Sequence, residues 1–340
     1  MNGGTAVPGE KPILDWLLQQ FPDTPKARAK QWIARGRVSV AGVIIRRPHQ
    51  VIPDPGDRLT LQDRGAMALE PVGGWQIHPR VCLLHLDSSV GVINKGPGLI
   101  SVPAPNCDLS ALSILQDFLV GRLKVSWRKQ SGRTVPPAWR RLVPFPVHRL
   151  DQYTSGAFCA GMNPEARQHL IEQLKTHTMT REYFAFAAGR SSVAQGTWRD
   201  WLQLSDDEMR QQVVSSSEGT APRSSARQAV THYQVVTEYQ LPGNSGFITK
   251  LRLRLETGLK HQIRVQAAHA GLPLIGDRLY NPDYRLGAVG EPPIAFPRQA
   301  LHAASLTLEH PALDGKRQTW TAPFPEDLRR LETTLNPKRI

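Results

Sequence analysis

The sequence predicts an α+β protein: a large domain built on a mainly antiparallel mixed sheet with inserted helices, preceded by a small α/β module. Three observations support this class. Strand-like segments follow one another as hairpins, and helical segments are inserted without the regular alternation of a parallel sheet. The chain contains no internal repeat, no G-x-G-x-x-G motif and no P-loop, so no nucleotide cofactor is expected. Residues 63–80, with Gly73-Gly74, have little periodicity and separate two periodic regions.

These regions divide the chain into four parts. We expect a disordered tail over 1–10, a small module over 11–62, a linker over 63–80 and the large domain over 81–335. In the module, apolar spacing predicts helices over 13–21 and 25–35, and Thr24-Pro25 supplies an N-cap and a proline at the first helical position of the second helix. Short strands are predicted over 38–40, 43–45 and 59–61.

The elements of the large domain follow from the same periodicities. The predicted strands span 83–86, 90–93, 181–187, 231–239, 247–257 and, as the last one, 301–308; the predicted helices span 109–122, 163–174, 260–270 and 327–335. Residues 123–146 are predicted to form a basic loop, and 190–228 a polar β-excursion with a mobile loop near 215–225. In the segment 247–257, leucines at 251, 253 and 255 alternate with arginines, so the leucines should face the core.

The charge balance points to a polyanionic partner. Forty-two Lys and Arg against 29 Asp and Glu leave a net charge of +13, which favours nucleic acid through counterion release, although a basic soluble protein without such a partner is the alternative. The three cysteines are far apart, which argues against disulfides and a zinc site. The chain lacks a secretory signal pattern and a long apolar run, so we expect a cytoplasmic protein that does not contact membranes.

Basic residues gather in the small module. On the second predicted helix and after it lie Lys26, Arg28, Lys30, Arg35 and Arg37. A solvated basic face is the simpler interpretation, but the clustering favours contact with an RNA backbone. The order of elements over 11–62 resembles the small RNA-binding module named after the fourth protein of the small ribosomal subunit, through Leu14-Asp15-Trp16-Leu17, Ile33-Ala34-Arg35-Gly36-Arg37-Val38 and Pro55-Gly56-Asp57.

The polar cluster His148-Arg149-Leu150-Asp151 is the strongest candidate for chemistry. Asp151 is predicted at the entrance of a strand, where loops expose functional groups, although an isolated aspartate is more often a cap or an ion-pair partner of Arg149. On a later strand, Tyr183 could form a flat wall for a planar base, or simply pack in the core. Arg264 could keep a nearby carboxylate ionised through a charge-assisted pair. The turn Gly276-Asp277 is interpreted as architectural.

Together these motifs resemble the signature of the RluA-type RNA pseudouridine synthases over about residues 80–330. The signature is His148-Arg149-Leu150-Asp151 with Thr154-Ser155-Gly156. Other segments match in the family's order, among them Asn94-Lys95, Arg181 with Tyr183, His261-Gln262-Ile263-Arg264, Gly276-Asp277 and Leu301-His302-Ala303. The resemblance implies that Asp151 is the nucleophile, Tyr183 contacts the target base and Arg264 pairs with Asp151. It also implies that Arg149 fills the space of an extruded nucleotide. The chain departs from the family pattern at Leu259-Lys260, at Gln266 and at Gly96.

The implied activity is the isomerisation of uridines in structured RNA, ribosomal RNA more than transfer RNA, by a monomeric enzyme that needs no cofactor and no metal. Lys260 is a further candidate RNA contact. Asp151 could attack C1′ or take a proton from C2′, and the sequence leaves both open. A glycoside hydrolase would need two carboxylates, whereas basic and amide residues surround Asp151. The alternative is a catalytically inactive RNA-binding or ribosome-assembly protein that retains the synthase fold.

Overall fold

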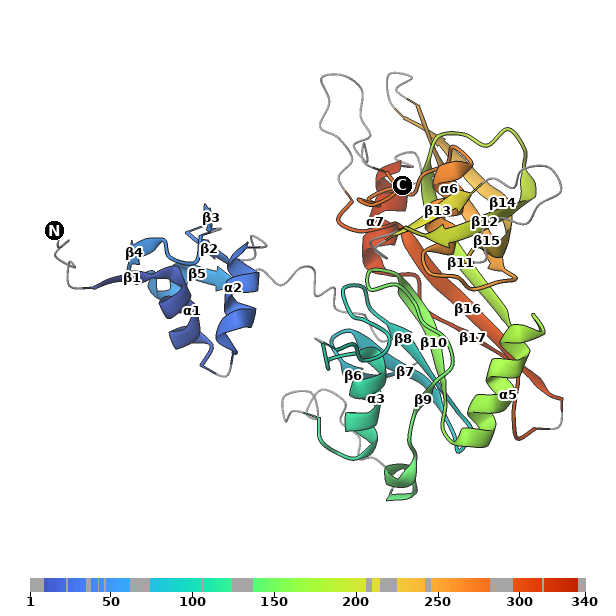
Figure 1. Cartoon of the computed structure of the whole chain (residues 1–340), viewed down its shortest axis with the longest axis horizontal. Coiled ribbons are helices and arrows are strands. Elements are labelled where there is room, and N and C mark those ends of the chain that lie inside the picture. Colours follow the sequence, from blue (N-terminus) through green and yellow to red (C-terminus); the bar gives the residue numbers. More distant parts are fainter. Residues whose placement is uncertain are drawn as a thin grey trace. The chain divides into compact units, whose positions relative to one another are not determined.

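Separate hydrophobic cores divide the chain into two units, Met1–Ala66 and Met67–Ile340, in the computed structural model (Figure 1). The structure describes residues 9–22, 24–34, 38–41, 43–45, 47–61, 74–105, 107–123, 137–205, 210–214, 225–241, 246–281, 296–313 and 315–335. Within these ranges, no helix is both long and apolar enough to cross a membrane. The expected basic loop and the loop near 215–225 lie largely outside the described residues.

In its described residues, the amino-terminal unit contains two α-helices, a short 3-10 helix (η1, Gly56–Arg58) and two small sheets. Its elements are β1 (Glu10–Pro12), α1 (Ile13–Gln20), α2 (Lys26–Ala34), β2 (Val38–Val40), β3 (Val43–Ile45), β4 (Val51–Pro53) and β5 (Leu59–Leu61). Strands β3, β2 and β5 form one antiparallel sheet, and β1 pairs with β4. Ile13 and Leu17 of α1 and Ile33 of α2 are fully buried in the core between them. The expected disordered tail over 1–10 extends too far, because Glu10 already belongs to β1 and pairs with Pro53 of β4.

One extended sheet organises the large unit. Its strands are β6 (Trp75–His78), β7 (Val81–Leu86), β8 (Val90–Lys95), β9 (Phe145–Pro146), β10 (Ser155–Gly161), β11 (Thr180–Ala188), β12 (Gln195–Leu204), β13 (Gln211–Val214), β14 (Arg227–Gln240), β15 (Phe247–Leu255), β16 (Leu301–Glu309) and β17 (Arg317–Thr321). The main order is β13-β12-β14-β15-β11-β16-β10-β8-β7-β6, with β17 beside β16 and β9 beside β10. Among the described strand pairs only β10 and β16 run parallel, which confirms the predicted mainly antiparallel sheet.

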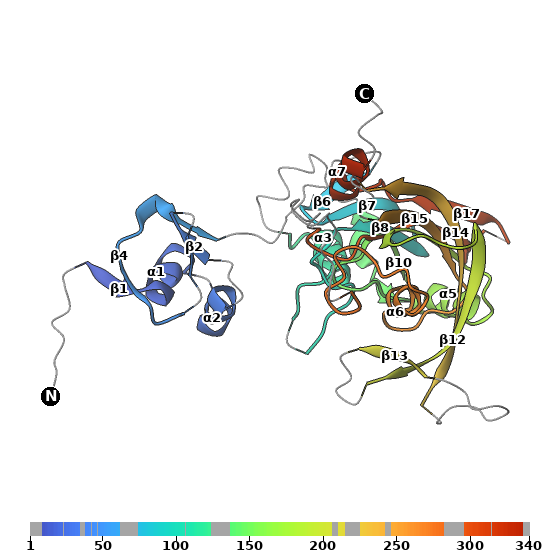
Figure 2. The same cartoon turned by 90° about the horizontal axis from the view of Figure 1, so that it is seen from above.

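Helices cover both faces of this sheet because alternate strand residues point to opposite sides. On β10, Phe158 joins the core that includes α3 (Ala111–Leu119) and α6 (Gln262–His269), whereas Cys159 joins the core that includes α5 (Pro164–Lys175). On β11, Phe186 packs against α7 (Glu326–Leu335). Figure 2 shows α6 and α7 on opposite sides of the strands. The predicted burial of the leucines on β15 is confirmed, because Leu251, Leu253 and Leu255 are buried and the arginines between them are exposed.

Two strands of the large unit were not predicted. The expected linker over 63–80 contains β6, which pairs with β7, and the strand over 301–308 is followed by a further strand, β17, which pairs with β16. Both missed strands are four or five residues long, and polar residues make up at least half of each. A short strand with so few apolar residues gives a weak periodic signal in the sequence, and its pairing partner supplies most of its stability.

The parallel pairing of β10 with β16 depends on Gly156. Its φ is +120°, and an added Cβ would lie 2.1 Å from the carbonyl oxygen of Ala303. We therefore expect Gly156→Ala to lower the free energy of unfolding by about 3 kcal/mol or more, since the collision is with backbone. Chemical denaturation measures the loss. Gly246→Ala is the matched control: its φ is +129° with open space around the Cβ, so it should cost only about 1 kcal/mol. Equal losses in the two variants would contradict this account.

Candidate active site

The loop before β10 holds Asp151 at the edge of a cavity. Next to it, the backbone of buried Leu150 is hydrogen-bonded twice to Ser101 Oγ, which accepts from the N–H and donates to the carbonyl oxygen, both at 2.8 Å. His148 Nε2 accepts the N–H of Cys159, and burial together with the charge of Arg181 lowers the pKa of His148 to about 3. His148 is therefore a neutral anchor for this loop. The Asp151 side chain, 18% exposed, is left facing the cavity.

A buried lysine supports the other side of this loop. Lys95, on β8, is fully buried. Within the described part of the chain, its Nζ donates to the main-chain carbonyl oxygens of Leu99 (2.8 Å), Gln152 (3.2 Å) and Gly96 (3.2 Å). Burial lowers the pKa of Lys95 to about 7, and the nearby charge of Arg298 acts in the same direction, while that of Asp151 opposes it. Lys95 thus ties the residue after Asp151 to the turn that follows β8.

Arg264 of α6 connects Asp151 to a second carboxylate. Its Nη1 lies 3.2 Å from Asp151 Oδ2, while Nε and Nη2 donate to Asp277 at 2.6 and 2.8 Å. The Asp277 side chain is fully buried and also accepts the N–H groups of Leu279 and Tyr280. Burial by itself would lower the pKa of Arg264, but the hydrogen bonds to Asp277 and the charges of Asp277 and Asp151 raise it overall. A bidentate pair of this kind fixes the plane of the guanidinium.

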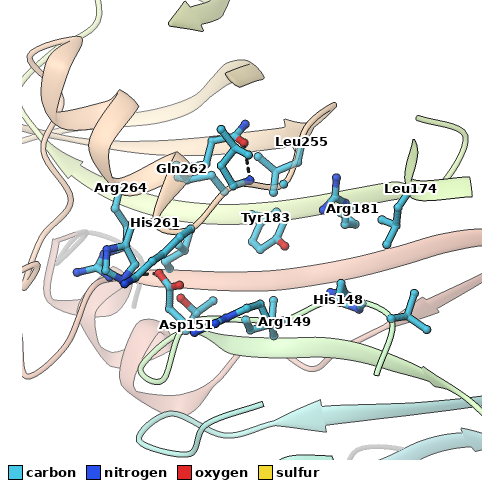
Figure 3. Close-up of a pocket in the computed structure, with 18 of the residues that line it drawn as sticks. His148, Arg149, Asp151, Leu174, Arg181, Tyr183, Leu255, His261, Gln262 and Arg264 are labelled. Carbon is cyan, nitrogen blue, oxygen red and sulfur yellow. Dashed lines mark hydrogen bonds and ion pairs between the residues drawn. The ribbon is translucent and has the colours of Figure 1, made fainter. Parts of the chain in front are cut away.

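Tyr183, on β11, lies on the cavity side of the sheet. It is 5% exposed, and burial raises its pKa, as does the charge of Asp151, while the charge of Arg181 lowers it. Figure 3 shows its ring between Asp151 and Leu255. A neutral aromatic side chain in this position offers a flat apolar surface close to the Asp151 carboxylate.

The cavity in front of these residues measures about 480 Å³. Its wall combines apolar side chains with polar and charged ones, which include Arg149, Asp151, Tyr183, Lys260, His261 and Arg264. A second cavity of about 320 Å³ lies along residues 100–104 and shares Asp151, His261 and Arg264 with the first. The fold therefore brings together the three predicted catalytic residues, which are far apart in the sequence, at a cavity that could enclose a small planar group.

The predicted RNA-binding residues fall into three groups. Exposed Arg149 and half-buried Lys260 line the cavity. Lys26, Arg28 and Lys30 are exposed on α2 of the amino-terminal unit. Arg35 and Arg37 lie outside the described residues.

Gln266, where the chain departs from the family pattern, is completely buried. Its Nε2 donates to Asp200 Oδ2 (2.7 Å) and to the carbonyl oxygen of Ala229 (3.2 Å), and its Oε1 accepts from Thr231 Oγ1 (2.7 Å). These bonds hold α6 against β12 and β14. The other departure, Leu259, lines the cavity and packs against a small cluster that includes Leu202.

A cluster of His85, Asp87 and His310 outside the cavity has the residue types of a metal site. Both imidazoles bond Asp87 Oδ2 through Nε2 at 2.7 Å, and His310 Nδ1 accepts the N–H of Ala312. Since Nδ1 is an acceptor, the proton of neutral His310 is on Nε2, which makes this nitrogen a donor and not a ligand. The cluster therefore links the turn after β7 to the end of β16 through hydrogen bonds.

Three residues of the site had no role in the sequence analysis. Lys95 and His261 entered only as parts of segments that match the family. The turn with Asp277 was interpreted as architectural, and the structure shows that Asp277 is the bidentate partner of Arg264. A buried aspartate after a glycine turn carries no local signal for its partner. Charge balance is the signal that could have indicated this partner. A buried arginine whose carboxylate partner is partly exposed requires a second carboxylate to compensate its charge.

The chain is similar to known proteins over most of its length. Residues 89–269 match the family described as RNA pseudouridylate synthase. The chain is 32% identical over 323 residues to ribosomal large subunit pseudouridine synthase D of Haemophilus ducreyi, covering 92% of this chain and 86% of the relative. It is 31% identical over 333 residues to the protein of the same name from Pseudomonas aeruginosa, covering 96% of this chain and 92% of the relative.

A solved structure resembles the fold. Human RNA pseudouridylate synthase domain containing 4 superposes with a TM-score of 0.52 and 21% sequence identity, covering 74% of this chain and 92% of the human chain. At this identity the likeness concerns the fold alone.

Proposed function

Because the chain belongs to the RNA pseudouridylate synthase family, we propose that it converts uridines of large-subunit ribosomal RNA into pseudouridine, with Asp151 as the catalytic nucleophile. The observation that carries the assignment of the site is the ion-pair chain Asp151–Arg264–Asp277 beside Tyr183. The ribosomal substrate is taken from the names of the curated relatives, which cover most of this chain.

The reaction moves one bond within a nucleotide. The N1–C1′ bond breaks and its electron pair leaves with the uracil, while Asp151 either attacks C1′ or removes a proton from C2′. The uracil then rotates and C5 bonds to C1′. On the first route the bond between Asp151 and C1′ breaks in this step, and on the second route C2′ regains its proton from Asp151. C5 loses its proton and N1 gains one, so the atoms of substrate and product are the same. Arg264 keeps the Asp151 carboxylate oriented, since its own orientation is set by two hydrogen bonds to Asp277.

The target uridine has to leave its stack to reach Asp151, as in other enzymes that act on bases. Tyr183 supplies a flat wall against which the uracil can lie. Arg149 fills the space that the extruded base leaves, a role supported by its exposure and its position in the cavity wall. Lys260 in the cavity wall supplies positive charge for the phosphates next to the target.

The amino-terminal unit is proposed as the RNA-binding module over residues 11–62, followed by a catalytic domain that ends near residue 335. The exposed Lys26, Arg28 and Lys30 on one short helix support this assignment, and Arg35 and Arg37 continue the basic run in the sequence. Contacts made by a separate basic module add to the affinity without taking part in the reaction.

Mapping of pseudouridines tests the proposal. Cells that lack this protein are expected to lose pseudouridine at one or a few positions of large-subunit ribosomal RNA, and the purified protein should restore them on RNA from those cells. Small-subunit and transfer RNA from the same cells are the internal controls and should be unchanged. Loss confined to transfer RNA would contradict the substrate assignment. If no position changed and the purified protein bound RNA without modifying it, the chain would be a binding protein.

A further inference from the structure

His261 occupies an unusual backbone position at the first residue before α6. Its φ and ψ are 56° and 14°, in the left-handed region, and its side chain makes no capping hydrogen bond to the helix. For a residue with a Cβ this conformation costs about 1 kcal/mol, and such strain is concentrated at functional sites. The side chain lines both cavities around Asp151.

A hydrogen-bond relay sets the tautomer of this histidine. The N–H of Gln211, which can only donate, lies 2.8 Å from Tyr280 Oη, and Tyr280 Oη lies 3.0 Å from His261 Nδ1. The arrangement that satisfies all three groups has Tyr280 accepting from Gln211 and donating its own proton to Nδ1. The remaining proton of a neutral His261 is then on Nε2.

The charge of His261 agrees with this relay. Burial lowers the pKa of His261 to about 4, and the positive charges of Arg264 and Lys260 act in the same direction, while Asp151 and Asp277 oppose them. The imidazole is therefore uncharged near neutral pH. Nε2 has no hydrogen-bond partner within the described part of the chain, and Figure 3 shows His261 beside Arg264 and Asp151.

We propose that His261 binds the extruded uracil, with Nε2–H donating a hydrogen bond to one of its carbonyl oxygens. This inference rests on the proposed function and adds a residue that contacts the reacting base. When N1–C1′ breaks, the electron pair that leaves with the uracil places negative charge on its carbonyl oxygens, so this hydrogen bond strengthens as the reaction proceeds. A neutral donor suits the position, because an imidazolium so close to Asp151 would pair with the nucleophile.

Single-turnover rates with sulfur-substituted RNA test the proposal. RNA with 2-thiouridine or 4-thiouridine at the target position replaces one carbonyl oxygen by sulfur, a weaker acceptor. For the wild-type protein, we expect one of the two thio substrates to react about 10-fold more slowly than uridine. His261→Phe should slow the reaction of the uridine substrate by about 10²-fold, which is the effect of removing one such donor. In this variant, the rates for that thio substrate and for uridine should no longer differ. Its RNA affinity should change little.

Two more variants separate contact from folding. His261→Gln places an amide N–H near the position of Nε2, so it should keep the thio discrimination and react faster than the phenylalanine variant. His269→Phe, at the exposed end of the same helix, lines neither cavity and should behave as wild type. If His261→Phe kept the full thio discrimination, or reacted within about 3-fold of wild type, the inference would be overturned while the proposed function stood. A wild-type protein that forms no pseudouridine overturns both.

Discussion

Asp151→Asn is expected to abolish pseudouridine formation while leaving RNA binding nearly intact. Asparagine has the same shape and can still accept the hydrogen bond from Arg264 Nη1, so the loop and cavity should be preserved. It lacks the carboxylate that attacks C1′ or removes the C2′ proton. We expect the single-turnover rate to fall by at least about 10³-fold, which corresponds to about 4 kcal/mol in the barrier. Pseudouridine analysis of the RNA measures the rate, and fluorescence anisotropy measures the affinity.

A second aspartate serves as the control for this variant. Asp87 is also held by several hydrogen bonds, including one from His85, but it lines neither cavity. Asp87→Asn should therefore retain the wild-type rate, with an effect on stability alone. A rate for Asp151→Asn close to that of wild type would refute the assignment of the nucleophile. Parallel losses of rate and RNA affinity would indicate a damaged fold instead.

Asp277→Asn is expected to reduce the rate without removing any group that touches RNA. The asparagine amide opposes one of the two N–H groups of Arg264, so the guanidinium loses its fixed plane and no longer orients Asp151. A displacement of about 1 Å at a reacting group costs about 10²-fold in rate. Because one partner of a buried pair is removed, the free energy of unfolding should also fall by about 3 kcal/mol. Denaturation curves and single-turnover rates at a temperature where the variant is folded measure the two effects.

The pair between Arg298 and Asp327 provides a matched control. It has the same bidentate geometry, with Nε–Oδ2 at 2.6 Å and Nη2–Oδ1 at 2.9 Å, and both side chains are nearly buried. Asp327→Asn should lower the stability by a similar amount, since it loosens α7, but should keep the rate within about 3-fold of wild type. Equal rate losses in the two variants would mean that Asp277 acts only through general stability.

Much of the local structure could be predicted from the sequence. The alternation of Leu251, Leu253 and Leu255 with arginines identified a half-buried strand, and the sequence around Asn163-Pro164 predicted the helix start where α5 begins, with Asn163 as its N-cap. These signals arise from interactions between residues close in the chain. Strands β1, β6 and β17 were missed because polar residues make up at least half of each, so they give little periodic signal, and they are stabilised by their neighbours in the sheet.

The candidate site also has one part that could be predicted from the sequence and another that only the structure shows. Residue types drew attention to Asp151, because a carboxylate in a polar cluster at a strand entrance is a local pattern, and the resemblance to the synthase family added roles for Tyr183 and Arg264. Only the tertiary structure brought Asp277 to Arg264, placed Lys95 beneath the loop and connected His261 to Gln211 through Tyr280. These contacts join groups from different elements, and a hydrogen-bond partner is decided by distance and direction in space, which residue spacing does not encode.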